Sequence, residues 1–308
     1  MTKVKEKEGV ILKQSQQRRP KVGTDAIIKF IRYFGLVKGC VSFKDKLAMF
    51  IWILLESLLY SLKSLKKNGE KKLYEKFCSI YNPVITVRNE DGLFRCRAWT
   101  DDILIVNPIT EFELRKYFSL KKGIFVDVGA HIGKYTIMVG RKLSEGKIVS
   151  IEADPENFEM LKENIAFNGL KNVIALNFAA FSKDGEITLY RSVSPHTSGY
   201  SVYLRDHTEA INVKAMKLDD ILANLGLERV DLIKIDVEGA EYDVLLGAKK
   251  TLEKTEVVIC EVIWGEKSEK CKDLLTKASF RLEDLGNNIV AVKNTGGEDG
   301  ETKNTCNF

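Results

Sequence analysis

The chain has 308 residues, of which 44% are hydrophobic, and a net charge of +5. This length and composition are enough for one sizeable α/β domain with an appendage. The six cysteines are scattered and include no Cys-x-x-Cys pair. Their arrangement argues against a zinc site and a disulfide framework, and it favours free thiols in a reducing compartment.

The charge is unevenly divided along the chain. Residues 1–82 contain 18 Lys and Arg against 7 Asp and Glu, whereas the remainder contains 30 against 36. A basic N-terminal part suits an anionic membrane or a nucleic acid, but it can also simply be solvated. Because residues 1–21 have no apolar core, we expect no signal peptide. The expected location is cytoplasmic, with the inner membrane surface as an option.

The first eighty residues predict a tail and a helical region. Residues 1–24 are polar and aperiodic and predict a disordered basic tail, and residues 25–80 predict helices. Asp45 is expected to cap a helix at Leu47–Leu62, whose only charge is Glu56. Its 16 residues would span roughly 24 Å, less than the roughly 30 Å hydrocarbon core of a bilayer.

This apolar helix has two interpretations. A helix that is apolar nearly all round must be covered, either within its own protein, which is the simpler interpretation, or at a membrane surface. Five lysines follow it within residues 63–72 and keep the membrane interpretation open. A peripheral contact between the basic N-terminal region and anionic membranes is therefore one prediction.

Residues 81–120 predict a β-hairpin and a lead-in helix. Two strand-like runs flank Asn89–Gly92, which is typical of a hairpin turn. Residues 111–118 then predict a helix that leads into the first core strand. We expect the ligand-binding domain to occupy residues 121–294 and a polar tail to occupy residues 295–308.

The first functional pattern is a strand, a glycine turn and a helix. Residues 124–128 are typical of a buried parallel strand, and Gly129 and Gly133 follow them. This is the first half of a nucleotide-binding βαβ unit. Counted from Gly129, a dinucleotide fingerprint needs its second glycine where His131 stands, and its absence argues against a dehydrogenase. The Asp127 carboxylate would repel a pyrophosphate and suits a cationic ligand such as S-adenosylmethionine.

The pattern Asp-x-Gly-x-x-x-Gly resembles motif I of Rossmann-like methyltransferases. Residues 147–152 predict the next strand, which ends in Glu152, 23 residues after Gly129. This spacing is close to the roughly 20 residues expected for an acid that binds a ribose. A carboxylate can accept hydrogen bonds from both ribose hydroxyls. The alternative is that Glu152 is a solvated acid at a strand end.

Further strands and helices are expected to alternate after this unit. Residues 192–203 predict a mobile loop over the site, in which His196 is either a base or simply exposed. Glu261 places a charge inside an otherwise apolar strand. The expected helices are 155–168, 242–252 and 267–277, and the expected strands are 172–177, 185–191, an edge strand at 211–216, 256–263, and a closing antiparallel pair at 280–284 and 289–292.

The second functional pattern lies in a core strand at 230–237. Lys234, Asp236 and Glu238 interrupt this apolar run at a period of two, which places them on one side of a regular strand. Buried charges are costly unless they are paired, and ligands bind at the strand ends of doubly wound sheets. The pattern therefore indicates either a site at the strand end or a structural Lys234–Asp236 ion pair.

Four segments together resemble the FkbM family of S-adenosylmethionine-dependent methyltransferases. They are Phe125–Gly133, Ile151–Pro155, Lys217–Ile221 and Asp231–Glu241, and the resemblance covers about residues 120–294. It implies an α/β, Rossmann-like methyltransferase fold: a mostly parallel sheet with helices on both faces and a closing antiparallel pair, here preceded by an N-terminal helical region. It also implies methyl transfer from S-adenosylmethionine to hydroxyls, often on sugars or secondary metabolites.

The sequence departs from the family pattern at two places. His131 stands where the family usually has a small polar residue such as asparagine. The third strand ends in Asn177–Ala180, without the acid that many related methyltransferases use near adenine. The resemblance therefore leaves the adenine contact unassigned.

We expect Asp236 to be the base that takes the proton of the attacking hydroxyl during an in-line displacement. Lys234 would pair with it or stabilise the developing alkoxide, and Glu238 would orient substrate hydroxyls or help to hold a divalent metal. No metal is expected, because no fourth ligand is apparent. The expected residues around S-adenosylmethionine are Asp127, Gly129, Ala130, Gly133, Glu152, Ala153 and Asn177.

Two further function classes stay open. One is a nucleic-acid or protein methyltransferase, although the acidic composition beyond residue 82 and the absence of an Asn-Pro-Pro-Tyr motif argue against a nucleic-acid substrate. The other is a non-catalytic, membrane-docked nucleotide-binding module, which would have no need for charges at a strand end. The expected partner is therefore a small-molecule or glycan acceptor.

Overall fold

The computed structural model describes residues 37–63, 78, 80–191, 201–202, 209–262 and 265–294. The chain divides into two compact units, Met1–Pro83 and Val84–Phe308. Several features expected from the sequence lie outside the described residues: the tail at 1–24, most of the lysine-rich run at 63–72, most of the loop at 192–203 with His196, and the tail at 295–308.

The N-terminal unit contains the 3₁₀ helix η1 (Val37–Gly39) and the long helix α3 (Phe43–Lys63). The predicted cap at Asp45 is displaced by three residues, because Ser42 caps the helix. The Ser42 hydroxyl accepts a hydrogen bond from the Asp45 backbone N–H, and the Asp45 carboxylate accepts one from the Ser42 N–H. This reciprocal arrangement is a capping box, and it starts the helix before the apolar run. Among the helices that the structure describes, none is both long and apolar enough to cross a membrane.

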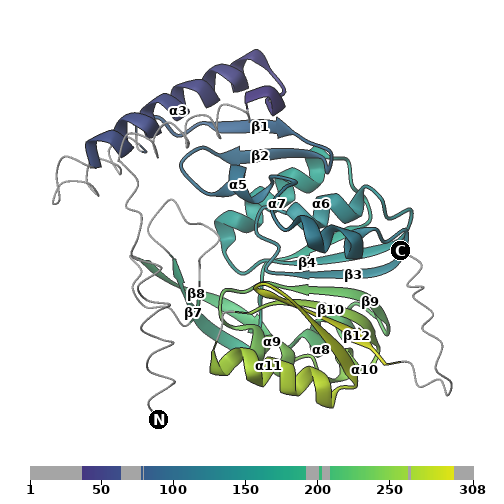
Figure 1. The fold of residues 1–308 in the computed structure, drawn as a ribbon. Helices are drawn as coiled ribbons and strands as arrows, with labels where there is room; N and C mark the ends of the chain where they lie inside the picture. The colour runs from purple at the N-terminus through teal and green to yellow at the C-terminus, as the bar shows by residue number, and fades with distance from the viewer. Residues whose placement is uncertain are drawn as a thin grey trace, which may run out of the picture. The chain divides into compact units, whose positions relative to one another are not determined.

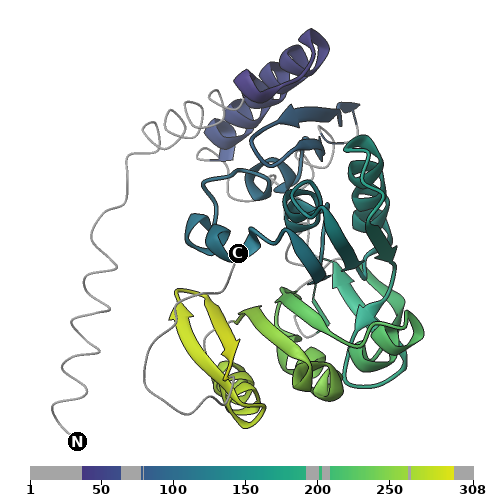
Figure 2. The ribbon, with the colours of Figure 1, turned by 90° about the vertical axis from the view of Figure 1, so that its right-hand side faces the viewer.

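Seven strands of the second unit form the central sheet, in the order β11-β12-β10-β9-β3-β4-β5 (Figure 1). The five neighbours from β10 to β5 are parallel, and β12 runs antiparallel to both β10 and β11. Figure 2 shows the closing pair, in yellow, at one edge. The predicted fold class is confirmed. The strands are β3 (Lys122–Val128), β4 (Glu145–Ile151), β5 (Val173–Leu176), β9 (Val230–Ile235), β10 (Thr255–Glu261), β11 (Phe280–Leu285) and β12 (Asn288–Lys293).

Helices cover both faces of this sheet because successive strand residues point to opposite sides. Val126 and Ile233 enter one core with α8 to α11, whereas Phe125 and Leu232 enter another with η2 and α6. Figure 1 shows α7 on the same side as α6. The bounds are η2 (Phe112–Phe118), α6 (Lys134–Gly140), α7 (Pro155–Phe167), α8 (Leu218–Asn224), α9 (Glu241–Leu246), α10 (Lys249–Glu253) and α11 (Glu266–Lys277).

The predicted hairpin is present as β1 (Val84–Arg88) paired with β2 (Leu93–Arg97), and the short helix α5 (Asp102–Ile105) follows it. The lead-in helix expected at 111–118 is the 3₁₀ helix η2. The helix expected at 242–252 is divided at Gly247 into α9 and α10. The chain at Gly247 also passes so close to the Phe181 carbonyl that a Cβ would lie 2.1 Å from its oxygen.

A second, three-stranded sheet corrects another expectation. It has the order β6-β8-β7, with β6 at Ala179–Ala180, β7 at Gly185–Arg191 and β8 at Glu209–Met216. The predicted edge strand is therefore wrong: β8 is central, since β7 pairs with one side of it and β6 with the other. The alternation in β8 reflects one covered face, which a central strand of a small sheet shares with an edge strand.

Candidate active site

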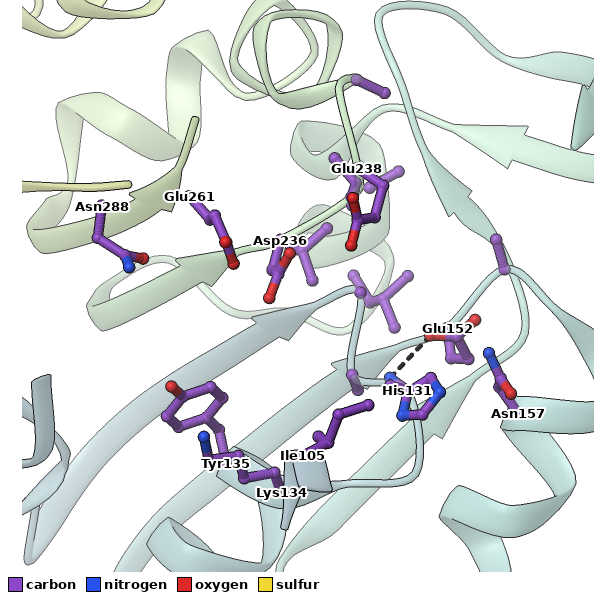
Figure 3. Close-up of a pocket in the computed structure, with 18 of the residues that line it drawn as sticks. Ile105, His131, Lys134, Tyr135, Glu152, Asn157, Asp236, Glu238, Glu261 and Asn288 are labelled. Carbon is purple, nitrogen blue, oxygen red and sulfur yellow. Dashed lines mark hydrogen bonds between the residues drawn. The ribbon is translucent and has the colours of Figure 1, made fainter. Parts of the chain in front are cut away.

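A cavity of about 660 Å³ lies at the carboxyl ends of the parallel strands (Figure 3). Its size falls within the range of roughly 300–1,000 Å³ that is usual for small-molecule sites. The turn after β3, the end of β4, the segment after β9 and the region around η2 all contribute to its wall. Of the residues expected in the site, six line it: Gly129, Ala130, Glu152, Ala153, Asp236 and Glu238.

The glycine turn joins the two predicted motifs. Gly129 has a φ of +80°, and a Cβ built on it would lie 1.8 Å from the carbonyl oxygen of Asp236. Only glycine permits this approach of the β3 turn to the end of β9. The Gly129 and Ala130 N–H groups also donate to the Ile151 carbonyl at 2.9 and 3.0 Å. Gly133, with a φ of +96°, begins α6 and does not line the cavity.

Glu152 is held firmly at the cavity wall. Its two carboxylate oxygens accept hydrogen bonds from the backbone N–H groups of His131 at 2.8 Å and Asp154 at 2.9 Å. Burial raises its pKa to about 7. The Asn177 amide does not line the cavity but donates to the carbonyl oxygens of Glu152 and Ala153, which fixes the end of β4. A carboxylate offers about four lone-pair positions, so Glu152 retains capacity to accept two ligand hydroxyls.

Asp127 lies behind the cavity wall. Its side chain accepts a hydrogen bond of 2.6 Å from the Thr136 hydroxyl, which in turn contacts the Ser150 hydroxyl at 2.7 Å. Burial raises the pKa of Asp127 to about 6. The carboxyl group therefore ties β3 to α6, and its expected contact with a cofactor stays a prediction.

Lys234 is completely buried and joins two carboxyl groups. Its Nζ lies 3.2 Å from Asp236 Oδ2 and 3.9 Å from Glu261 Oε2. Burial alone would lower the pKa of Lys234, but Asp236, Glu111 and Glu261 outweigh it and raise that pKa. β9 ends at Ile235, so Asp236 lies just beyond the strand, where its side chain is 31% exposed. Lys234 itself does not reach the cavity.

The opposite wall carries a group that the sequence did not indicate. Glu111 accepts hydrogen bonds from Lys134 Nζ at 2.9 Å and from the Tyr135 hydroxyl. Burial, followed by Glu111, raises the pKa of Tyr135 well above its usual value. Figure 3 shows Lys134 and Tyr135 across the cavity from Asp236 and Glu261. Lys134 and Tyr135 directly follow the glycine turn and could have been suspected, whereas Glu111 comes from a distant segment without a motif.

Asp236, Glu238 and Glu261 form an acidic wall of the cavity, and the amide of Asn288 lies beside it (Figure 3). Burial raises the pKa of Glu238 to about 7 and that of Glu261 to about 8, in each case with help from Asp236. Asn288 is 7% exposed, and its Oδ1 has no hydrogen-bond partner among the residues described. A buried carbonyl oxygen without a donor is costly, so this atom is suited to a ligand that supplies a hydroxyl or amine.

Three side chains that could together hold a metal ion lie close to one another: Asp101, Asp102 and His131. The Arg97 guanidinium, however, donates to both Asp102 oxygens, at 2.8 and 2.9 Å. A metal ion beside this guanidinium would be repelled, so the cluster fits an ion pair better than a metal site. His131 has a φ of +50°, the left-handed region in which asparagine is also favoured.

Most of the residues that line the cavity lie in a segment that is similar to known methyltransferases. The methyltransferase FkbM domain matches residues 127–287. Methyltransferase sdnD of Sordaria araneosa is 31% identical over 154 residues, covering 40% of this chain and 59% of sdnD. Hexuronic acid methyltransferase AglP of Haloferax volcanii is 26% identical over 203 residues, covering 66% of this chain and 80% of AglP.

A third relative is the 2-O-methyltransferase NoeI of Sinorhizobium fredii. It is 27% identical over 155 residues, covering 45% of this chain and 62% of NoeI. The chain thus spans less than two thirds of the length of sdnD and of NoeI.

Proposed function

The chain belongs to the FkbM family of methyltransferases, and we propose that it uses S-adenosylmethionine to methylate a hydroxyl of a sugar or another small metabolite. Two relatives named for a 2-O-position and for a hexuronic acid support a hydroxyl-bearing acceptor. The observation that carries the proposal is the carboxylate of Asp236, partly exposed in the cavity and paired with the buried Lys234.

The residues around the glycine turn fit such a cofactor. Glu152 has acceptor capacity for a ribose diol, and the acidic wall complements a sulfonium and an ammonium group. When bound, S-adenosylmethionine supplies the activated methyl group, and Gly129, Ala130, Glu152 and Ala153 would hold it. Phe178 and Ile151 add apolar surface to the same part of the wall.

The groups beyond β9 can bind and deprotonate the acceptor hydroxyl. Asp236 would accept the proton, and the buried Lys234 ammonium lies 3.2 Å from its Oδ2. Glu261, with its pKa raised to about 8, is protonated at neutral pH and can donate a hydrogen bond to the acceptor. Asn288 Oδ1 would accept a hydrogen bond from a second acceptor group.

The charge on the wall narrows the acceptor class. Six acids line the cavity, and even with Glu261 protonated at neutral pH they outnumber the lysine and arginine side chains on the wall. Among the described residues, those are limited to Lys134, which is paired with Glu111. A carboxylate on the acceptor would meet repulsion, and the described residues of the wall offer no lysine or arginine that is not already paired. We therefore expect a neutral or amino sugar, in contrast to the acceptor for which AglP is named.

Calorimetry and methyl transfer together test the proposal. We expect micromolar affinity for S-adenosylmethionine, no comparable affinity for NADH, and transfer of radiolabelled methyl to neutral or amino sugars in preference to uronic acids. Glu152→Gln should weaken cofactor binding by about 1.5–3 kcal/mol, the worth of a hydrogen bond to a charged group. The matched control is Glu145→Gln, at the exposed start of the same strand, which should bind normally.

Three results would count against this reading. Tight NADH binding without S-adenosylmethionine binding would rule out the proposed methyl transfer from S-adenosylmethionine. Preference for a uronic acid would contradict only the expectation of a neutral or amino sugar, and it would leave the proposed methyl transfer standing. An unchanged dissociation constant in folded Glu152→Gln would return Glu152 to a purely structural role.

A further inference from the structure

The exposed face of α3 carries an apolar stripe that methyl transfer does not use. Phe43 is 82% exposed, and Leu47, Phe50, Leu54 and Leu58 are between 38% and 51% exposed. At about 100° per residue, these five side chains fall within an arc of about 80° on the helix. We call this set the α3 stripe. Its regularity over four turns distinguishes it from scattered surface apolar residues.

A different face of α3 does the packing. Met49, Trp52 and Ile53 are at most 3% exposed and lie well outside the arc of the α3 stripe. The helix therefore has a packing face and, separately, an apolar face that the described residues of its own unit leave exposed. Exposing five large apolar side chains in a row is unfavourable unless something covers them.

The charges on α3 indicate what covers the stripe. Lys44 and Lys46 are exposed, and each lies about 40° outside one edge of the stripe. Asp45 and Glu56 lie on the opposite side of the helix, at about 180° and 160° from the centre of the stripe. Basic residues thus border the apolar face and acidic residues avoid it, as in helices that lie in an anionic lipid interface.

We propose that the α3 stripe docks on an anionic lipid surface, with the helix lying in the plane of the membrane. The apolar side chains would enter the acyl boundary while the two lysines reach lipid phosphates. The wider sequence supplies the same sign of charge, because residues 1–82 hold 18 Lys and Arg against 7 Asp and Glu. A second copy fits less well, since a two-fold contact through the stripe would bring four lysines together.

Vesicle sedimentation of the full-length chain tests this docking. We expect binding to phosphatidylcholine vesicles that contain about one third phosphatidylserine, weaker binding to pure phosphatidylcholine, and loss of binding at high salt. The variant Phe43→Gln/Leu47→Gln/Leu54→Gln should bind at least about tenfold more weakly. Lys44→Gln/Lys46→Gln should weaken binding roughly fivefold for each lysine removed, from the usual worth of about 1 kcal/mol per basic residue.

The matched control is Phe167→Gln, which removes a phenylalanine 45% exposed at the end of α7. It should bind vesicles like the unmodified chain, and all variants should retain cofactor binding as a check on folding. Unchanged sedimentation of the triple variant would overturn the proposal. The proposal would also be overturned if the unmodified chain self-associated without binding vesicles and the triple variant did not self-associate. The α3 stripe would then be an interface between copies.

Discussion

At the scale of single residues, two carboxyl groups compete for the buried charge of Lys234. Asp236 is closer, at 3.2 Å, and Glu261 lies at 3.9 Å. The two differ in what they can do at neutral pH, because burial, Asp236 and other neighbours raise the pKa of Glu261 to about 8. A protonated Glu261 cannot accept a proton, which is why we propose Asp236 as the base.

We expect Asp236→Asn to lower the single-turnover rate of methyl transfer on the order of 10²–10⁴-fold, the usual worth of general base catalysis. Asparagine keeps the shape of the side chain but cannot take the proton. Because we propose that Asp236 contacts the acceptor and not the cofactor, the dissociation constant of S-adenosylmethionine should change little. The measurement is therefore a pair, the rate and the dissociation constant on the same preparation.

Glu261→Gln is the matched control for this prediction, since it removes a carboxyl group beside the same lysine. Its amide can still donate the hydrogen bond expected of the protonated acid, so the rate should fall less than tenfold at pH 7. A near-normal rate in Asp236→Asn with a large loss in Glu261→Gln would assign the base to Glu261. A loss of cofactor affinity in Asp236→Asn would place Asp236 against the cofactor instead.

At the scale of elements, the contact between the β3 turn and the end of β9 holds the site together. Gly129 allows that contact, because its φ is +80° and a Cβ would strike the Asp236 carbonyl. The contact joins the turn that would hold the cofactor to the residue that would deprotonate the acceptor. Any residue that pushes the two segments apart should disturb both functions together.

Gly129→Ala should therefore lower the free energy of unfolding by roughly 3 kcal/mol or more and remove cofactor binding. The matched control is Gly169→Ala. Gly169 also has a positive φ, +65°, but a Cβ there would meet nothing within 4 Å. The only cost of Gly169→Ala should then be the strain of a side chain at a positive φ, roughly 1–2 kcal/mol, and cofactor binding should persist. Equal losses in chemical denaturation of the two variants would show that the close approach has no effect of its own.

At the scale of the whole molecule, local patterns predicted the central sheet well. The apolar runs of β3, β4 and β9, the glycine turn and the acids Glu152 and Asp236 are all visible in short windows of sequence. They lie on the cavity because parallel strands bring their carboxyl ends to one edge. Asp127 is likewise an acid near the end of a core strand, but its side chain lies behind the cavity wall, where it accepts a hydrogen bond from the Thr136 hydroxyl.

Other parts of the site depend on contacts between distant segments. Glu111 reaches Lys134 and Tyr135 only because η2 packs across the sheet, and its own segment has no motif. Asn288 enters the cavity because β12 returns antiparallel to β10. The central place of β8 depends on β6, a strand of two alanines that no periodicity can reveal. Such features are set by tertiary packing, which a single sequence does not display.

The collection of acids at one edge of the sheet should make stability depend on pH. Glu152 and Glu238 have pKa values raised to about 7, and Glu261 to about 8, chiefly by burial, against 4.5 in an unfolded chain. At pH values between 4.5 and about 7 to 8, the folded protein therefore binds more protons than the unfolded one. The stabilisation is therefore complete below about pH 4.5 and is lost as the pH rises through 7 to 8.

We expect the free energy of unfolding of the ligand-free protein to fall by roughly 1–3 kcal/mol between pH 6.5 and 8.5. This figure is discounted because Glu261 is 34% exposed. The window avoids the opposite effect of His131, whose pKa burial lowers from 6.5. It also lies above the range of Asp102 and Glu111, whose pKa values lie below their usual 3.8 and 4.5.

Urea denaturation at several pH values measures the slope, and Glu152→Gln should flatten it near pH 7. A stability that rises over this window would mean that these carboxyl groups are ionised in the folded protein at neutral pH.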